Sequence, residues 1–133
     1  MKRLYLLRHA KSCWRHTSLA DPERPLNKRG RRDAPRMGAA LGRRLAPTRF
    51  HCSPAMRARL TFSGLCAGWP GLQPRDVIIE QALYTFDAGA LLDAAAAAGA
   101  RQIVTAFVPQ GPMRPHLDAL RRAAGARGLR VAE

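Results

Sequence analysis

The stretch Arg3-Leu-Tyr-Leu-Leu-Arg-His-Ala-Lys-Ser12 decides the fold. Residues 4–7 form a short apolar run that is typical of a buried strand, and the chain becomes polar at once with Arg8 and His9. In an open α/β sheet, functional groups lie where strands end. A neutral imidazole offers an unprotonated nitrogen and a guanidinium binds phosphate oxygens in pairs, so Arg8 and His9 suit attack on a phosphoryl group. Taken alone, the dipeptide favours the simpler interpretation of two exposed side chains on a basic protein.

Apolar segments and helical patterns alternate along the rest of the chain. We expect strands at 4–7, 49–53, 77–80 and 102–108, and helices after Gly30, after Ser53, at 88–98 and at 117–124. This alternation predicts an α/β fold, a three-layer α/β/α sandwich with a mostly parallel sheet. With 133 residues and no internal repeat, residues 1–133 are expected to form a single domain.

Two of the expected helices have recognisable limits. The first helix should end before Pro47 and bury its periodic apolar side chains, which are Ala34, Met37, Leu41 and Leu45. For the second helix, Ser53 is expected as the N-cap and Pro54 as the first helical residue. Its expected inward side chains are Met56, Leu60, Phe62 or Ser63, and Leu65.

The charge and the aromatic content of the chain indicate which binding partners are favoured. The chain has 23 Lys and Arg against 9 Asp and Glu, a formal charge of +14, which attracts phosphate, nucleic acid or acidic protein surfaces. Part of this charge has a simpler origin, because abundant Arg and Ala reflect the codon bias of a GC-rich genome. The eight aromatic residues are scattered and no nucleic-acid motif is present, so a nucleic-acid partner is not favoured.

The protein is expected to be located in the cytoplasm. The apolar run after Lys2 and Arg3 is too short for a signal peptide, and no stretch is long enough to span a membrane. The three cysteines have no close pairs, which indicates neither a disulfide framework nor a zinc site.

Polar residues follow three of the expected strands: Arg8 and His9, then Ser53 and Arg57, then Glu80. Because the ends of parallel strands share one edge of a sheet, these side chains are expected to converge on one pocket. The helix start after Ser53 adds free N–H groups and partial positive charge, which favour an anion.

Four motifs, in this order and spacing, resemble the histidine phosphatase superfamily and most of all its SixA-type phosphohistidine phosphatases. They are Leu6-Leu-Arg-His-Ala-Lys-Ser12, Arg24-Pro-Leu-Asn-Lys-Arg-Gly30, Ser53-Pro-Ala-Met-Arg-Ala-Arg59, and Glu80 with Leu83-Tyr84. Each motif alone is weak, but four in register over residues 2 to about 100 are a specific signal. The resemblance implies a phosphoglycerate-mutase-like fold that lacks some C-terminal elements.

The resemblance also implies roles for four residues. His9 would be the nucleophile that becomes phosphorylated, Arg8 and Arg57 would clamp the phosphate, and Glu80 would stand where many members have the acid for the leaving group. No metal or organic cofactor is implied, and the pocket would hold phosphate or another oxyanion. The residues themselves leave two alternatives open, because Arg57 also suits an exposed helix position and Glu80 also suits an ion pair with a neighbouring Arg.

One family feature is not found. The family places a second histidine in a Gly-His-Asn-Pro signature after its last core strand, where this chain has Ile103-Val-Thr-Ala-Phe-Val-Pro-Gln-Gly-Pro112. His116 is the histidine nearest to this segment, and a lone histidine at a helix start is more often an exposed or capping residue. Divergence and a change of reading frame near residue 100 are both compatible with this difference.

The leading interpretation is a phosphatase that acts through a phosphohistidine intermediate, with protein phosphohistidine as substrate and with activity reduced by the missing histidine. The alternatives are a catalytically silent relative that binds phosphate or phosphoprotein, and a small-molecule phosphomonoesterase of the same superfamily. The partner is therefore a phosphorylated protein or a small phosphate ester.

Overall fold

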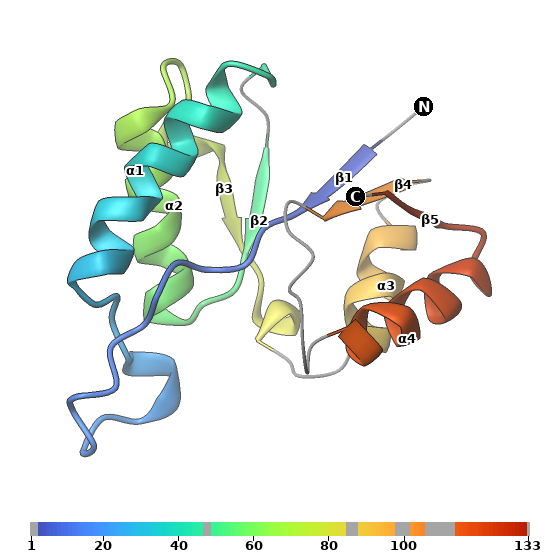
Figure 1. The fold of residues 1–133 in the computed structure, drawn as a ribbon, viewed down its shortest axis with the longest axis horizontal. Coiled ribbons are helices and arrows are strands. Elements are labelled where there is room, and N and C mark those ends of the chain that lie inside the picture. Colours follow the sequence, from blue (N-terminus) through green and yellow to red (C-terminus); the bar gives the residue numbers. More distant parts are fainter. Residues whose placement is uncertain (1–2, 47–48, 85–87, 98–101, 106–113, 133) are drawn as a thin grey trace. The chain divides into compact units, whose positions relative to one another are not determined.

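The computed structural model describes residues 3–46, 49–84, 88–97, 102–105 and 114–132. The chain divides into two compact units, one of Met1–Leu7 with Thr85–Glu133 and the other of Arg8–Tyr84 (Figure 1). Each unit is described by itself, and the single domain expected over the whole chain stays a prediction.

The first unit contains a three-stranded parallel sheet in the order β1-β4-β5. Its strands are β1 (Arg3–Leu6), β4 (Gln102–Thr105) and β5 (Arg130–Ala132), and its helices are α3 (Ala88–Ala97) and α4 (Arg114–Gly125) (Figure 1). Leu92, Ala124 and Leu129 are buried here. The strand expected at 102–108 is observed through Thr105, and residues 106–108 lie outside the described residues.

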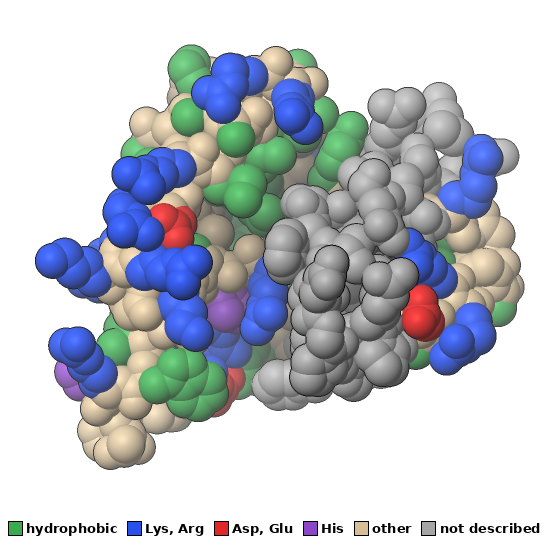
Figure 2. All heavy atoms as spheres, viewed as in Figure 1, with side chains coloured by type: hydrophobic (Ala, Val, Ile, Leu, Met, Phe, Trp, Pro, Cys, Tyr) green, Lys and Arg blue, Asp and Glu red, His purple; other side chains and the backbone are tan. Residues whose placement is uncertain are grey.

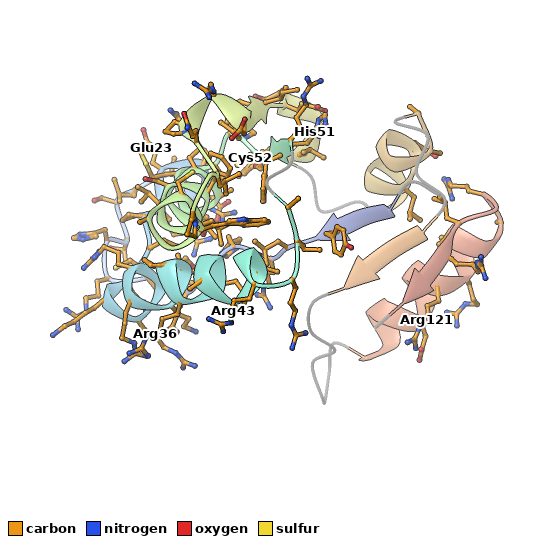
Figure 3. The ribbon with its side chains drawn as sticks, turned by 90° about the horizontal axis from the view of Figure 1, so that it is seen from above. Glu23, Arg36, Arg43, His51, Cys52 and Arg121 are labelled. Atoms are coloured by element: carbon orange, nitrogen blue, oxygen red, sulfur yellow. The ribbon has the colours of Figure 1, made fainter. Side chains whose placement is uncertain are left out.

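The second unit pairs two parallel strands, β2 (Phe50–Cys52) and β3 (Val77–Ile79), with helices α1 (Lys28–Gly42) and α2 (Met56–Gly68). Three short 3-10 turns, Asp21–Glu23, Pro74–Asp76 and Gln81–Leu83, complete it. The ring of Phe50 contacts Phe62 and Trp69, with centroids 5.1 Å and 5.9 Å apart. Along β2, Cys52 is buried and His51 is exposed, as the two-residue period of a strand requires (Figure 3).

Helices α1 and α2 pack through their smallest residues. The buried positions of α1 are Gly30, Ala34 and Gly38, whereas Met37 is exposed, so its expected place in the core is wrong. A Cβ atom at Gly38 would lie 2.4 Å from the carbonyl oxygen of Leu65. The two backbones are too close for a larger side chain, and this close approach turns Met37 away from the interface.

The start of α2 also differs from the prediction. The helix begins at Met56 with Ala55 as its N-cap, so Ser53 is not the cap and Pro54 is not its first residue. The Oγ of Ser53 instead accepts a hydrogen bond from the N–H of Ala55 at 3.3 Å, which turns the chain into the helix. Met56 is exposed and Leu65 is buried, so the expected inward face is partly confirmed.

Within each unit the strands are parallel and are connected through helices, which confirms the predicted α/β fold class. Strand β1 ends at Leu6, one residue earlier than expected, and Leu7 separates it from the polar pair Arg8 and His9. No helix among the described residues has the length and apolar character needed to cross a membrane.

Candidate active site

His9 is held in one tautomer. Its Nδ1 lies 2.8 Å from the carbonyl oxygen of Ala10, which can only accept, so Nδ1 carries the proton and donates it. Its Nε2 accepts a hydrogen bond from Nε of Arg57 at 3.3 Å. The lone pair of Nε2 therefore carries no proton and points to the guanidinium of Arg57.

The environment keeps this imidazole neutral. Burial is the main cause that lowers the pKa of His9 below its usual 6.5, and the positive charges of Arg57 and Arg8 add to the effect. The carbonyl of Ala10 acts in the opposite direction and is outweighed. At neutral pH the ring is unprotonated, which is the form a nucleophile needs.

Arg57, in the first turn of α2, is buried and makes three hydrogen bonds through three different nitrogens. Besides the bond to His9, its Nη1 donates to the carbonyl oxygen of Asp21 at 2.7 Å and its Nη2 donates to Oδ2 of Asp21 at 3.0 Å. The plane of the guanidinium is thus fixed against the imidazole. The expected meeting of His9 with Arg57 is observed.

Asp21 is the centre of a polar network that the sequence did not reveal. Its carboxylate accepts from Tyr84 Oη at 2.7 Å, from Arg57 and from Arg24, whose Nε donates at 3.1 Å. The bond from Tyr84 is the largest cause that lowers the pKa of Asp21 to about 2, followed by the bonds from the two arginines. The same contact raises the pKa of Tyr84. Asp21 is therefore an anion that orients Arg57.

Thr61 connects the loop of His9 to helix α2. Its Oγ1 donates to the carbonyl oxygen of Arg57 at 2.7 Å and accepts from the N–H of Ala10 at 2.9 Å. The residue after His9 is thereby bonded to the helix that carries the guanidinium of Arg57. One buried hydroxyl sets the spacing between the two motifs.

Two further guanidiniums belong to this region. Arg24 is buried, lies 3.7 Å from the ring centroid of Trp14 and has one buried nitrogen, Nη1, without a hydrogen-bond partner. A buried donor without an acceptor is costly, and an anion would satisfy it. Arg8 is exposed beside His9 and makes no hydrogen bond within the described residues. Both side chains add positive charge that lowers the pKa of His9.

Glu80 follows β3 and contacts a residue that sequence reasoning did not select. Its Oε1 accepts a hydrogen bond from Nδ1 of His51 on the neighbouring strand, and its N–H donates to the carbonyl oxygen of Cys52 at 2.9 Å. The expected alternative partner was an arginine, and the observed partner is a histidine. Its role as an acid for the leaving group stays a prediction.

The profile of the histidine phosphatase superfamily (branch 1) matches residues 4–111. The chain belongs to this superfamily. The match spans the loop of Arg8 and His9, both helices of the second unit, and Glu80.

Solved structures of SixA proteins have the same fold. A SixA protein of Agrobacterium tumefaciens, assigned as a phosphohistidine phosphatase, is 23% identical with a TM-score of 0.63, covering 93% of this chain and 77% of that one. Its counterpart from Nakamurella multipartitia is 25% identical with a TM-score of 0.59, covering 96% and 68%. The protein histidine phosphatase SixA in complex with tungstate is 20% identical with a TM-score of 0.56, covering 88% and 72%.

A curated relative is also found among plant proteins. An uncharacterized chloroplastic protein of Arabidopsis thaliana is 36% identical over 90 residues, which is 65% of this chain. The chain spans 40% of the length of that relative.

The superfamily signature places its second histidine after the last core strand. In this chain that segment includes residues 106–113, which lie outside the described residues. His116 lies in the first turn of α4, and its side chain is likewise not described. The interpretation of His116 as an exposed or capping residue stays a prediction.

Proposed function

We propose that this chain is a phosphatase in which Nε2 of His9 accepts the phosphoryl group of the substrate and then passes it to water. The observation that carries the proposal is the geometry of His9, whose Nδ1 donates to Ala10 and whose Nε2 faces Arg57 at 3.3 Å. An unprotonated lone pair that faces a buried cation suits attack on phosphorus, because the cation can release the nitrogen and bind the oxygens of the group under attack.

The proposed reaction has two steps. In the first, the lone pair of Nε2 forms a bond to phosphorus while the bond from phosphorus to the leaving group breaks, and the leaving group takes a proton from water or from Glu80. In the second, water attacks the phosphorylated His9, which releases inorganic phosphate and restores the neutral imidazole. Both steps place negative charge on the equatorial oxygens, where arginine stabilises it.

Three guanidiniums would share this charge. Arg8 and Arg57 flank His9, and the unpartnered Nη1 of Arg24 is a third donor in the same network. Arg57 would exchange its bond to Nε2 for one to a phosphoryl oxygen, while its two bonds to Asp21 keep its plane in place.

For the substrate we propose phosphohistidine on a protein. The support is the fold shared with SixA proteins, two of which are named as phosphohistidine phosphatases and one as a protein histidine phosphatase. Imidazole is a good leaving group, so the reaction depends less on an acid than the hydrolysis of an alcohol ester does. This fits a site in which Glu80 is bonded to His51.

Trapping the intermediate tests the proposal. The purified chain is incubated with a phosphohistidine protein or an aryl phosphate that carries radiolabelled phosphate, then quenched and examined for acid-labile label on the chain. We expect label and turnover in the wild type and neither in His9→Ala. The variant His51→Ala, which removes another histidine of the same unit, should keep the label.

The second candidate is a silent relative that binds phosphate with the same arginines. It is favoured by the segment 103–112, which has no histidine where the superfamily signature has one. Phosphate binding without label or turnover would establish this candidate and contradict the enzyme. Turnover of the aryl phosphate with no reaction of phosphohistidine protein would establish the small-molecule phosphomonoesterase instead.

A further inference from the structure

A groove of about 650 Å³ lies between residues 11–16 and residues 25–31, all within the unit Arg8–Tyr84. Two backbone hydrogen bonds join its walls: the N–H of Cys13 donates to Pro25 at 2.8 Å and the N–H of Asn27 donates to Lys11 at 2.9 Å. The groove begins two residues after His9 along the chain. Its two walls are therefore fixed to each other and to the loop of the nucleophile.

The groove is strongly positive. Its described lining has no Asp or Glu and contains five basic residues, which are Lys11, Arg15, Lys28, Arg29 and Arg31. Arg29 is compensated by Asp33, which accepts from its Nε at 3.3 Å. Lys11, Arg15 and Lys28 are exposed and have no ion pair within the described residues. Figure 2 shows the Lys and Arg side chains gathered over α1 and the loop before it.

One wall of the groove continues into the polar network of the site. Trp14 is 69% exposed, and its ring lies 3.7 Å from the guanidinium of Arg24. Arg24 in turn donates to Asp21, which holds Arg57. A ligand in the groove would therefore lie beside the network that orients the site.

We propose that this groove docks an acidic segment of the phosphorylated protein on which the chain acts. The proposal rests on the proposed function only in naming the docked partner as the substrate. Unpaired cations attract an acidic segment at a distance and select it over neutral segments. A protein segment fits better than nucleic acid, because the described lining has two aromatic rings, those of Trp14 and His16. Trp14 already stacks on Arg24, so no row of free rings is offered to bases.

Binding of an unphosphorylated peptide tests the groove independently of catalysis. The probe is a fluorescent peptide with a run of Asp and Glu, and its anisotropy is measured with the wild type, His9→Ala, and the double variant Arg15→Glu/Lys28→Glu. We expect equal binding by the first two and about tenfold weaker binding by the double variant, the combined effect of a few exposed ion pairs. Lys28→Glu places an acid in the first turn of α1, where the helix dipole favours it and the fold is retained.

The matched control is Arg36→Glu/Arg43→Glu, which makes the same change of charge outside the groove. Both residues are exposed and lie along one side of α1 (Figure 3). We expect this variant to bind the acidic peptide several-fold more tightly than the groove variant does. Equal weakening by the two double variants would overturn the proposal, because only net charge would then matter.

Kinetics complete the test. For a phosphohistidine peptide with the acidic run, we expect Arg15→Glu/Lys28→Glu to raise KM about tenfold and to leave kcat unchanged. A peptide with Gln and Asn in place of the acids, and an aryl phosphate, should react equally with wild type and variant. No preference for the acidic peptide would overturn the proposal, and so would binding of an oligonucleotide of equal charge at least as tight as that of the peptide. Groove-dependent binding by a chain that hydrolyses nothing would support the docking surface and contradict only the proposed function.

Discussion

His9 and His51 belong to the same unit and have opposite surroundings. His9 is half-buried, donates from Nδ1 to a backbone carbonyl and faces the guanidinium of Arg57. His51 is exposed on β2 and donates from Nδ1 to the carboxylate of Glu80. Burial and nearby cations keep the ring of His9 neutral and able to attack, whereas the ring of His51 has a carboxylate partner with which it can exchange a proton.

The difference separates two kinds of chemistry within one unit. In the proposed mechanism His9 forms the bond to phosphorus, and the pair of His51 and Glu80 can at most exchange a proton. A change in the partners of His9 should therefore affect every phosphate substrate. A change in the pair of His51 and Glu80 should affect only substrates with a poor leaving group.

The largest effect is expected from Arg57→Ala, which removes the cation that faces His9. Loss of one preorganised donor to the phosphoryl oxygens should lower kcat by about 10²- to 10³-fold for phosphohistidine and aryl phosphate alike. Steady-state kinetics with both substrates measures this. Arg57→Lys should recover little, because one ammonium cannot make three hydrogen bonds in the plane of a guanidinium.

The matched control for Arg57 lies two residues further along the same helix. Arg59 is exposed, and Arg59→Ala should leave kcat unchanged for both substrates. An equal loss in the two variants would mean that the general charge of α2 matters and that the contact with His9 does not.

Glu80→Gln tests whether the pair of His51 and Glu80 supplies a proton to the leaving group. An alcohol phosphate ester needs a proton on its leaving group, and a general acid contributes about 10²-fold or more. We expect kcat for such an ester to fall by about this factor in Glu80→Gln and the rate for phosphohistidine to change little. His51→Ala should repeat the pattern more weakly, because it removes the bond that orients Glu80.

Equal losses on both substrates in Glu80→Gln would place Glu80 in phosphate binding and exclude the acid. No loss on either substrate would make the pair with His51 structural. Parallel assays of one alcohol ester and one phosphohistidine peptide distinguish these outcomes.

The sequence predicted the meeting of His9 and Arg57 because each follows an expected strand, and the ends of parallel strands share one edge of a sheet. In the structure β1 and β2 belong to different sheets, and the contact is held within the second unit by Thr61 and Asp21. The core between α1 and α2 was harder to predict. A helical pattern read from large apolar residues selected Met37, but the buried stripe is Gly30, Ala34 and Gly38 at a spacing of four residues. Glycines that permit close backbone contact give no hydrophobic signal.

Asp21 could not have been assigned from its surroundings in the chain. It lies in a loop without apolar period, and two of its partners, Arg57 and Tyr84, are 36 and 63 residues away. The available signal was indirect, since Asp21 is one of only 9 acids in a chain with 23 basic residues. An acid next to the motif that begins at Arg24 has an above-average chance of pairing with arginine.

Asp21→Asn should have a smaller effect than the loss of Arg57. The amide keeps the shape but removes the charge that orients two guanidiniums, so we expect kcat to fall by about tenfold with KM less affected. A control at Asp33, whose partners Arg29 and Arg32 are exposed, should leave kcat unchanged in Asp33→Asn. Unchanged kcat in Asp21→Asn would show that Arg57 holds its place without the carboxylate.

The same variant should change the dependence of stability on pH. The pKa of Asp21 is about 2 in the folded chain against the usual 3.8, so its ionised form stabilises the fold above pH 3.8. This contribution is lost as the pH falls from 3.8 to about 2. The free energy of unfolding is measured by chemical denaturation at several pH values in this range. It should fall less in Asp21→Asn than in the wild type, and an equal fall in both would contradict the lowered pKa of Asp21.

The smallest expected effect concerns the pH dependence of His9. Because burial and nearby arginines lower its pKa, the acid limb of kcat/KM should lie below pH 6.5, and NMR titration of the ring should give the same value. The neutral ring also stabilises the fold above pH 6.5, and this contribution decreases as the pH falls through the lowered pKa. In Arg57→Ala the acid limb should move to higher pH, because one cation that lowers the pKa of His9 is gone. It should stay below pH 6.5, because burial remains the main cause of the lowered pKa. A limb that stays in place would mean that Arg57 acts on the phosphoryl group alone, and the contrast with His51 would then rest on burial and not on charge.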